Sequence, residues 1–281
     1  MFTCLSPGAI GISAGLERGI QLAKDAGFQG VEVPIGEVAN LLNEIGAERV
    51  INLFRKNGIL PGGWGLPVEW RGDEERWRKD LEQLPRLAKA GQAIGCTRVS
   101  TWVMPCSNTM TYSEYWDFAV ARFTPIAKTL RDHGCSLGLE FIGPKTLWTS
   151  QKYEFIHTMD KMLELDAAIG PNVGLLLDCW HWYTAHHTVA EVEALKPEQV
   201  VYVHVNDAPV GIPVDEQMDN VRDLPGATGV IDLVGFLRGL KKIGYQGPIT
   251  PEPFHKPTAA LPADEAARDT AAALNKVWAK I

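Results

Sequence analysis

The sequence lacks long apolar runs, paired-cysteine motifs and an excess of basic residues. No run approaches the ~20 apolar residues of a membrane span, and the N-terminus has no secretory signal pattern. The five cysteines include no CxxC pair, so we expect buried, reduced thiols in a cytoplasmic protein. The formal net charge of −7 argues against a nucleic-acid partner, which usually requires a basic surface. A small ligand is expected instead, either neutral or an anion held by local Arg and Lys.

The chain also lacks linkers and low-complexity tracts, so we predict one domain spanning residues 1–281. Short apolar runs alternate with amphipathic stretches, and a glycine often separates a predicted helix from the next strand. The predicted strands cover residues 2–12 (with a loop), 30–35, 59–65, 98–103, 136–141, 173–178, 200–207 and 248–252. The predicted helices cover residues 13–26, 37–57, 73–94, 112–133, 152–169, 188–196, 231–243 and 264–279. Eight strands alternating with eight helices predict a closed parallel sheet, the (β/α)8 TIM barrel of the α/β class.

Four predicted strands share one feature: each ends in a side chain that ligates hard metal ions. These residues are Glu140, Asp178, His204 and Glu252. The C-terminal ends of barrel strands converge on one mouth, so residues that end strands five to eight can meet around one ion. Three carboxylates and one imidazole suit Mn²⁺ first, and Mg²⁺, Co²⁺ and Zn²⁺ are compatible alternatives. A divalent cation would also remove the repulsion among the three acids.

Each of these four residues has a simpler explanation when it is taken alone. An isolated glutamate at a strand end is usually a solvated loop residue or a helix cap, and His204 alone could be a hydrogen-bonded core histidine. The coincidence of register across four consecutive strands favours one shared metal site.

Motifs around these strand ends carry a family resemblance. They are Leu139-Glu140-Phe141, Leu177-Asp178-Cys179-Trp180-His181, Val203-His204-Val205-Asn206-Asp207, Pro225-Gly226-Ala227-Thr228-Gly229-Val230-Ile231-Asp232, and Gly244-Tyr245-Gln246-Gly247-Pro248 leading into Glu252. Together they resemble the xylose isomerase-like TIM-barrel superfamily, in its sugar phosphate isomerase/epimerase branch. That branch includes ketose 3-epimerases, inosose dehydratases and hydroxypyruvate isomerases. The resemblance covers essentially the whole chain, is specific for the branch and says little about the substrate.

The resemblance implies a carbohydrate substrate and roles for individual residues. It implies that the four strand-end residues bind one divalent metal, and that Glu140 and Glu252 act as acid and base on opposite faces of a bound ketose. His181 stands three residues after Asp178, where ketose epimerases carry a substrate-binding histidine. Arg222 corresponds to an arginine that contacts a substrate oxygen, although it lies much further past His204 than in those enzymes. A homo-dimer or homo-tetramer is expected on the same analogy.

The chemistry expected of such a site is proton removal from a carbon next to a carbonyl. That proton is weakly acidic, so a chelated cation must stabilise the enediolate as it forms. One carboxylate takes the proton and the other returns it on the opposite face, in an order that the sequence does not fix. This mechanism defines a metal-dependent isomerase or epimerase. A lyase is the alternative, because dehydration of an inosose or dehydroshikimate, or cleavage of a 3-keto-glycoside, shares the first step.

Other side chains near strand ends are candidates for substrate contacts. Trp64 and Trp102 could pack on the C–H faces of a sugar, with ordinary packing between loops as the alternative. Glu32 could hydrogen-bond substrate hydroxyls or pair with a nearby Arg or Lys. Lys145 is a candidate for holding an anionic group, or else a solvated lysine.

Two further classes of protein are disfavoured. A DNA-repair endonuclease of the same fold would use a multinuclear zinc site with histidines early in the chain, but the first histidine here is His133. A non-catalytic sugar-binding barrel would have no need to keep all four metal-type ligands.

Overall fold

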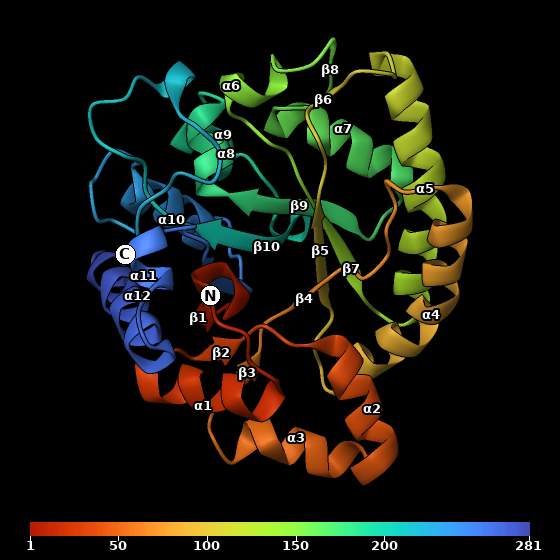
Figure 1. Ribbon diagram of the computed structural model, residues 1–281, viewed down its shortest axis with the longest axis vertical. Coiled ribbons are helices and arrows are strands. Elements are labelled where there is room, and N and C mark those ends of the chain that lie inside the picture. The colour runs from red at the N-terminus through yellow and green to blue at the C-terminus, as the bar shows by residue number, and fades with distance from the viewer.

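A curled parallel sheet lies in the middle of the molecule, with helices arranged around it (Figure 1). The computed structural model describes residues 1–281. The sheet has nine strands in the order β3-β2-β1-β11-β10-β9-β7-β5-β4. Their bounds are β1 Phe2–Leu5, β2 Gly30–Val31, β3 Leu60–Pro61, β4 Trp64–Gly65, β5 Arg98–Trp102, β7 Ser136–Glu140, β9 Val173–Asp178, β10 Val200–Val205 and β11 Pro248–Pro251.

The sheet closes into a ring through two strands of two residues each, β3 and β4. β3 pairs with β2 and β4 pairs with β5, and only Gly62 and Gly63 separate β3 from β4 along the chain. The predicted third strand is therefore one segment that reaches both neighbours in two short pieces. Glycine is required at Gly63, because a Cβ atom there would lie 2.5 Å from the Tyr202 ring inside the barrel. The predicted (β/α)8 barrel is confirmed.

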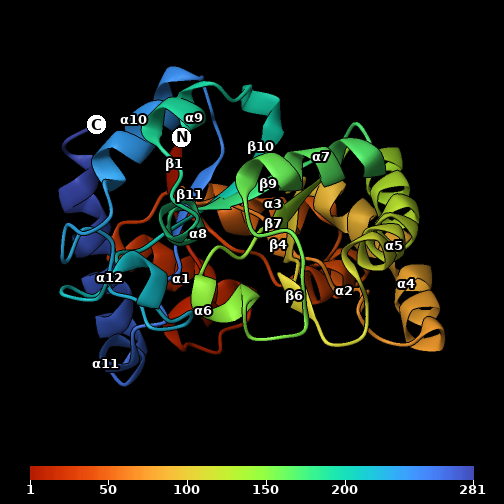
Figure 2. The ribbon, with the colours of Figure 1, turned by 90° about the horizontal axis from the view of Figure 1, so that it is seen from above.

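The helices pack outside the strands. The main ones are α1 Leu16–Ala26, α2 Ile35–Ile45, α3 Ala47–Arg55, α4 Glu74–Ala93, α5 Tyr112–Asp132, α7 Met159–Ile169, α9 Val189–Glu193, α10 Leu233–Lys242 and α12 Ala263–Trp278. Short segments decorate the loops: η1 Gly8–Ile10, α6 Lys145–Trp148, α8 Cys179–Thr184, η2 Pro197–Gln199, η3 Val214–Glu216 and α11 Lys256–Ala259. A small antiparallel pair, β6 Cys106–Ser107 and β8 Tyr153–Glu154, lies apart from the barrel. In Figure 2, α4 and α5 stand on the side opposite α10 and α12.

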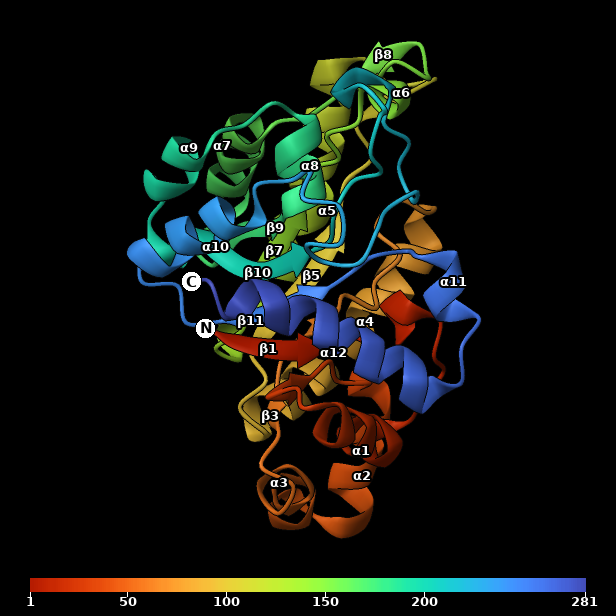
Figure 3. The ribbon, with the colours of Figure 1, turned by 90° about the vertical axis from the view of Figure 1, so that its left-hand side faces the viewer.

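Two predicted helices differ from the structure. The helix predicted over 37–57 is two helices, because Gly46 has a left-handed φ of +81° and ends α2 before α3 begins. The helix predicted over 152–169 starts only at Met159, because the residues before it form β8. Figure 3 shows α7 and α9 at the upper left and α1 and α3 at the bottom, on opposite sides of the strands.

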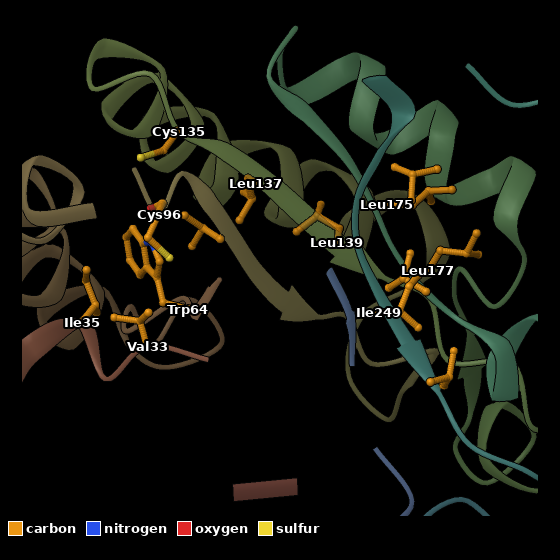
Figure 4. Packing of buried hydrophobic residues seen from close by; sticks show 14 of the residues in the cluster. Val33, Ile35, Trp64, Cys96, Cys135, Leu137, Leu139, Leu175, Leu177 and Ile249 are labelled. Carbon is orange, nitrogen blue, oxygen red and sulfur yellow. Dashed lines mark hydrogen bonds between the residues drawn. The ribbon is translucent and has the colours of Figure 1, made fainter. Parts of the chain in front are cut away.

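The main hydrophobic core lies between the sheet and the helices. Leu137, Leu139, Leu175 and Leu177 are fully buried, and Figure 4 shows them spread along neighbouring strands. Such continuously apolar strands are typical of a parallel sheet covered by helices. None of the helices combines the length and hydropathy that crossing a membrane requires.

Candidate active site

Strand alternation directs four polar side chains to one end of the barrel. In β9 and β10 the odd-numbered positions Leu177 and Val203 join the outer core, while Asp178 and His204 face the interior. Successive side chains of a strand point to opposite sides, so this difference follows from the two-residue period. The register places His204 beside Asp178. Parallel strands in this register bring their C-terminal side chains to a common level.

The four predicted ligands converge in space. Glu140, Asp178, His204 and Glu252 each contribute one ligand-type atom, and these atoms all lie within 4.8 Å of one another. His204 Nδ1 lies between two carboxylates, 3.5 Å from Glu140 Oε1 and 3.4 Å from Glu252 Oε2. A divalent ion bound by side chains is ~2.0–2.6 Å from each ligand atom, so one ion can reach all four after small rotamer adjustments.

Two buried atoms in this cluster have no hydrogen-bond partner. They are Glu140 Oε1 and His204 Nδ1. Leaving a buried polar atom unpaired is costly, and these two atoms lie 3.5 Å apart, close enough to contact one shared ion. The donor set is three carboxylate oxygens and one ring nitrogen, which fits a hard or borderline divalent ion. The residues present therefore fit a metal of this class.

The two glutamates have different environments. Burial raises the pKa of Glu140 to about 8, and the Glu252 carboxylate adds to that effect. Burial alone would raise the pKa of Glu252, but His204 and Arg222 lower it below its usual range. Burial opposes protonation of His204, yet the two glutamates raise its pKa well above the ordinary value. Without a metal ion, a positive charge on the His204 imidazole balances the negative charge of the neighbouring glutamates. A bound cation would supply that positive charge instead.

Asp178 is the most firmly held of the four. Its Oδ1 accepts hydrogen bonds from the Trp180 backbone N–H at 2.8 Å and from Asn206 Nδ2 at 3.0 Å. Asn206 also donates to the Glu252 backbone carbonyl at 3.3 Å, and so ties two strand ends together. These contacts fix the orientation of Asp178 and leave Oδ2 directed toward the cluster.

A buried arginine completes the cluster. Arg222 Nη1 lies 2.6 Å from Asp178 Oδ2 and 3.0 Å from Glu252 Oε2, and Nη2 lies 3.0 Å from Asp219 Oδ1. Although burial opposes a positive charge, these carboxylates raise the pKa of Arg222. The guanidinium therefore stays charged among acids.

The segment that carries Arg222 is held by one buried aspartate. Asp207 Oδ1 accepts the backbone N–H groups of Ala208 and Ile231, and Oδ2 accepts those of Thr228 and Gly229. Its backbone exchanges two further hydrogen bonds with Asp223, next to Arg222. These hydrogen bonds to the segment 228–231 therefore hold the end of the long loop close to the C-terminal end of β10.

A cavity of about 390 Å³ reaches two of the four predicted ligands. Its lining includes three of the predicted substrate-binding residues, Trp102, His181 and Arg222, with Glu140 and Glu252 also lining the cavity. His181 Nδ1 accepts the Gly143 backbone N–H at 3.2 Å, and burial lowers the pKa of His181 to about 3. The imidazole is therefore neutral, and its Nε2 lies 3.3 Å from Arg222 Nη2.

Glu32 lies beside this cavity rather than in its wall. It lines a neighbouring cavity above the first strands, accepts a hydrogen bond from Ser6 Oγ and pairs with no Arg or Lys. Burial raises the pKa of Glu32, and His204 lies close enough to influence it. Glu32 thus lines the neighbouring cavity and remains near His204.

The prediction that Trp64 contacts substrate is wrong. Its side chain is fully buried, and its indole N–H donates to the Cys96 carbonyl at 3.0 Å. The ring packs against Gly91 of α4, and Figure 4 shows it beside Cys96 in the core. Gly63 faces the barrel interior, so the next residue must face the helices.

Lys145 is also outside the cavity. Its Nζ lies 2.8 Å from Asp215 Oδ2, and the residue lines a different hollow together with His186. Lys145 therefore pins the loop that carries Arg222 and does not reach the ligand cluster.

Several lining residues were not anticipated from the sequence. They are Met104, Ile142, Leu147, Asp219, Asn220 and Phe254. Three of them stand two residues beyond a strand-end residue: Met104 after Trp102, Ile142 after Glu140, and Phe254 after Glu252. The same two-residue period that directs the ligands inward could have identified these three.

Comparison with known proteins places the chain in a family. The model described as xylose isomerase-like TIM barrel matches residues 20–277, and the chain belongs to that family. An inosose isomerase of Halalkalibacterium halodurans is 24% identical over 267 residues, covering 92% of this chain and 90% of the relative. A 3-dehydroshikimate dehydratase of Pseudomonas aeruginosa is 26% identical over 263 residues, which cover 90% of this chain and 38% of that longer protein.

Solved structures share the architecture. A xylose isomerase domain protein from Alicyclobacillus acidocaldarius superposes with a TM-score of 0.87 at 30% identity, covering 100% of this chain and 99% of its own. The IOLI protein with a bound zinc atom has a TM-score of 0.79 at 20% identity, with 100% and 99% covered. A D-psicose 3-epimerase has a TM-score of 0.72 at 16% identity, with 98% of each chain covered. At those identities the last two show the common fold.

Proposed function

We propose that this protein is a divalent-metal-dependent isomerase or epimerase of a sugar or sugar derivative. The observation that carries the proposal is the convergence of Glu140, Asp178, His204 and Glu252 within 4.8 Å beside an open cavity. Two relatives that align over at least 90% of both chains are inosose isomerases, which supports a cyclic or open polyhydroxy ketone as substrate. Mn²⁺ is the ion we expect, because one imidazole among oxygen donors suits it well.

A cation held by these four residues would supply the positive charge that an enediolate needs as it forms. The side chains then have separable tasks. Glu140 and Glu252 flank His204 from two sides, so one carboxylate can remove a proton next to the carbonyl and the other can return it. Arg222 neutralises Glu252, and His181 offers a neutral hydrogen-bond donor to a substrate oxygen. Trp102 and the neighbouring apolar side chains exclude water from the reacting carbon, and Glu32 reaches hydroxyls from the neighbouring cavity.

A lyase remains the second candidate. The match to a 3-dehydroshikimate dehydratase favours it, because elimination of a β-leaving group begins with the same proton abstraction. The two reactions differ only in whether the enediolate is reprotonated or expels a substituent.

One experiment distinguishes these reactions. The Mn²⁺-loaded protein is incubated in D₂O with ketohexoses, inososes and keto-glycosides, and deuterium uptake and products are followed by NMR. Deuterium in an isomer or epimer supports the first reaction, and loss of water or of the aglycone supports the second. Absence of exchange with every compound would contradict both.

Variants test the acid–base pair. Glu140→Gln and Glu252→Gln should each abolish exchange, while Glu44→Gln, an exposed change on α2, should keep it. Each variant is also titrated with Mn²⁺, so that loss of the ion is separated from loss of the proton acceptor. Wild-type exchange in either active-site variant would remove that glutamate from the mechanism.

A further inference from the structure

The cavity beside the ligand cluster is lined by side chains of two chemical kinds. Six lining residues are polar: Glu140, His181, Asp219, Asn220, Arg222 and Glu252. The other five are apolar and are called the wall: Trp102, Met104, Ile142, Leu147 and Phe254. The five apolar side chains offer no hydrogen-bond partner to sugar hydroxyls, whereas an apolar group attached to the sugar would lose its contact with water against them. The wall is suited to an apolar group attached to that sugar.

The two aromatic members of the wall are partly exposed. Trp102 retains 42% of its surface exposed and Phe254 retains 37%, which is unusual for such large apolar side chains. The segment that supplies Asp219 and Asn220 also exposes Met218 and Val221. Large exposed apolar side chains in and near a cavity are typical of a ligand-binding surface.

Trp102 is held rigidly in its exposed position. The Arg71 guanidinium carbon lies 4.1 Å from the centre of the Trp102 ring, and Arg71 Nη1 donates to the Trp102 carbonyl at 3.0 Å. A ring fixed by a stacked cation loses little freedom when it contacts a ligand. The contact is thus preorganised.

Phe254 is placed at a cost to the backbone. Its φ is +41°, a conformation that favours glycine, and its ring lies 4.8 Å from the Arg222 guanidinium carbon. A strained non-glycine residue beside a reactive cluster persists because the surrounding structure requires it there. Glycine would adopt this φ without strain, but only a residue with a side chain can contribute apolar surface to the cavity, as Phe254 does.

No positive charge in the lining of the cavity is free to hold an anion. Arg71, which stacks on Trp102 from outside the lining, lies 3.6 Å from Glu69 Oε1. Arg222 is the only Lys or Arg in the lining, and Asp178, Asp219 and Glu252 already contact its guanidinium. With a divalent ion bound, the carboxylates and the cations still leave no positive surplus. A carboxylate or phosphate on the substrate would therefore be repelled.

We propose that the substrate is a neutral hydroxyketone sugar that carries an aryl or comparably apolar substituent, with the substituent held against Trp102 and Phe254. This inference rests on the proposed function for the position of the hydroxyketone, and it goes beyond that function in the substrate class. It disfavours sugar phosphates and carboxylated ketones such as 3-dehydroshikimate.

Binding measurements test the substituent. The Mn²⁺-loaded protein is titrated calorimetrically with phenyl 3-keto-β-D-glucopyranoside, its methyl analogue and 3-dehydroshikimate. The phenyl compound should bind at least ~10-fold more tightly than the methyl compound, because burying an aromatic ring removes apolar surface from water. The carboxylate should bind more weakly than both. Equal affinity for phenyl and methyl compounds, failure of the phenyl compound to bind, or preference for the carboxylate would overturn the proposal.

Variants locate the contact. Trp102→Ala and Phe254→Gly should remove most of the phenyl preference. Phe254→Gly is expected to fold at least as well as the wild type, because glycine adopts a positive φ without strain. Tyr112→Ala is the matched control: Tyr112 is 41% exposed but lines a different cavity, so the preference should be unchanged. A phenyl preference that survives both cavity variants would place the substituent elsewhere.

Deuterium exchange separates this proposal from the proposed function. A phenyl preference without exchange would support the apolar subsite and contradict the reaction. Exchange with unsubstituted ketoses and no phenyl preference would do the reverse.

Discussion

Arg222 Nη1 lies 2.6 Å from Asp178 Oδ2, inside the cluster of carboxylates that could hold a metal ion. The guanidinium therefore takes part of the coordination capacity of Asp178 and repels any cation that approaches it. The same contact stabilises the cluster when no ion is bound. Arg222 and a metal ion thus interact with the same carboxylates. Arg222 stabilises the ion-free protein and weakens the binding of the ion.

Replacement of this arginine should separate those two effects. In Arg222→Met the ion-free protein should lose about 3 kcal/mol of unfolding free energy, because buried carboxylates remain unpaired. Its Mn²⁺ affinity should rise, because the competing cation is gone. Urea unfolding with and without Mn²⁺ measures both. Arg18→Met, which removes an exposed pair with Asp264, should change stability by less than about 1 kcal/mol. A loss of Mn²⁺ affinity in Arg222→Met would show that the arginine supports the ion instead of competing with it.

Asn206 should matter for metal binding although it is not a ligand. Its side chain donates to Asp178 Oδ1 and to the Glu252 carbonyl, so it orients one ligand and holds the strand end of another. Asn206→Ala should weaken Mn²⁺ binding about 10–100-fold, the usual effect of removing such a supporting contact. Competition with a fluorescent chelator gives the affinity. Asn108→Ala, in an exposed loop, is the control, and an unchanged affinity in Asn206→Ala would leave Asp178 oriented by Trp180 alone.

Asp166 on α7 should make stability depend on pH. Both of its carboxyl oxygens are buried without a partner, and burial raises its pKa well above the usual range. The folded protein thus favours the protonated acid. Its contribution to stability is complete below the unfolded pKa of ~3.9 and is lost as the pH rises through the folded value.

Asp166→Asn should therefore become more stable relative to the wild type as the pH rises from ~4 to ~8, by up to about 1.4 kcal/mol per pH unit within the titration range. Urea unfolding across this range measures the difference between the two proteins. Asp166→Ala should follow the same trend, because it too lacks the carboxyl. A difference that is constant with pH would mean that Asp166 has a partner or solvent access in solution.

The sequence was sufficient for the barrel and for the convergence of its four ligands because both follow from short periods. Apolar runs of strand length, glycines at helix ends and polar residues at four strand ends are local signals, and closure of the ring brings the strand ends together. The boundaries that failed depend on distant partners. β8 forms where Glu154 pairs with Cys106, which no local pattern around residues 152–158 indicates.

The cavity wall was only partly predictable. Trp102 and Trp64 both stand at strand ends, yet one lines the cavity and the other is in the core. Residue type cannot separate them, but strand alternation can place Trp64. Gly63 faces the barrel interior, so Trp64, the next residue, must face the helices. Asp219 and Arg222 reach the site on a long loop, whose path is set by Asp207 through hydrogen bonds that no spacing rule predicts.

The buried position of Trp64 predicts that replacing it affects stability and leaves ligand binding unchanged. Its indole N–H donates to the Cys96 carbonyl and its ring fills the space above Gly91, so Trp64→Phe loses a buried hydrogen bond and some packing. The free energy of unfolding should fall by about 1–3 kcal/mol. The affinity for phenyl 3-keto-β-D-glucopyranoside should be unchanged, because the ring is separated from the cavity by the sheet. Trp102→Phe should show the opposite pattern, with little loss of stability and weaker binding of the phenyl compound. Urea unfolding and calorimetry on the same two variants decide the matter, since weakened binding in Trp64→Phe at full stability would return that tryptophan to the cavity.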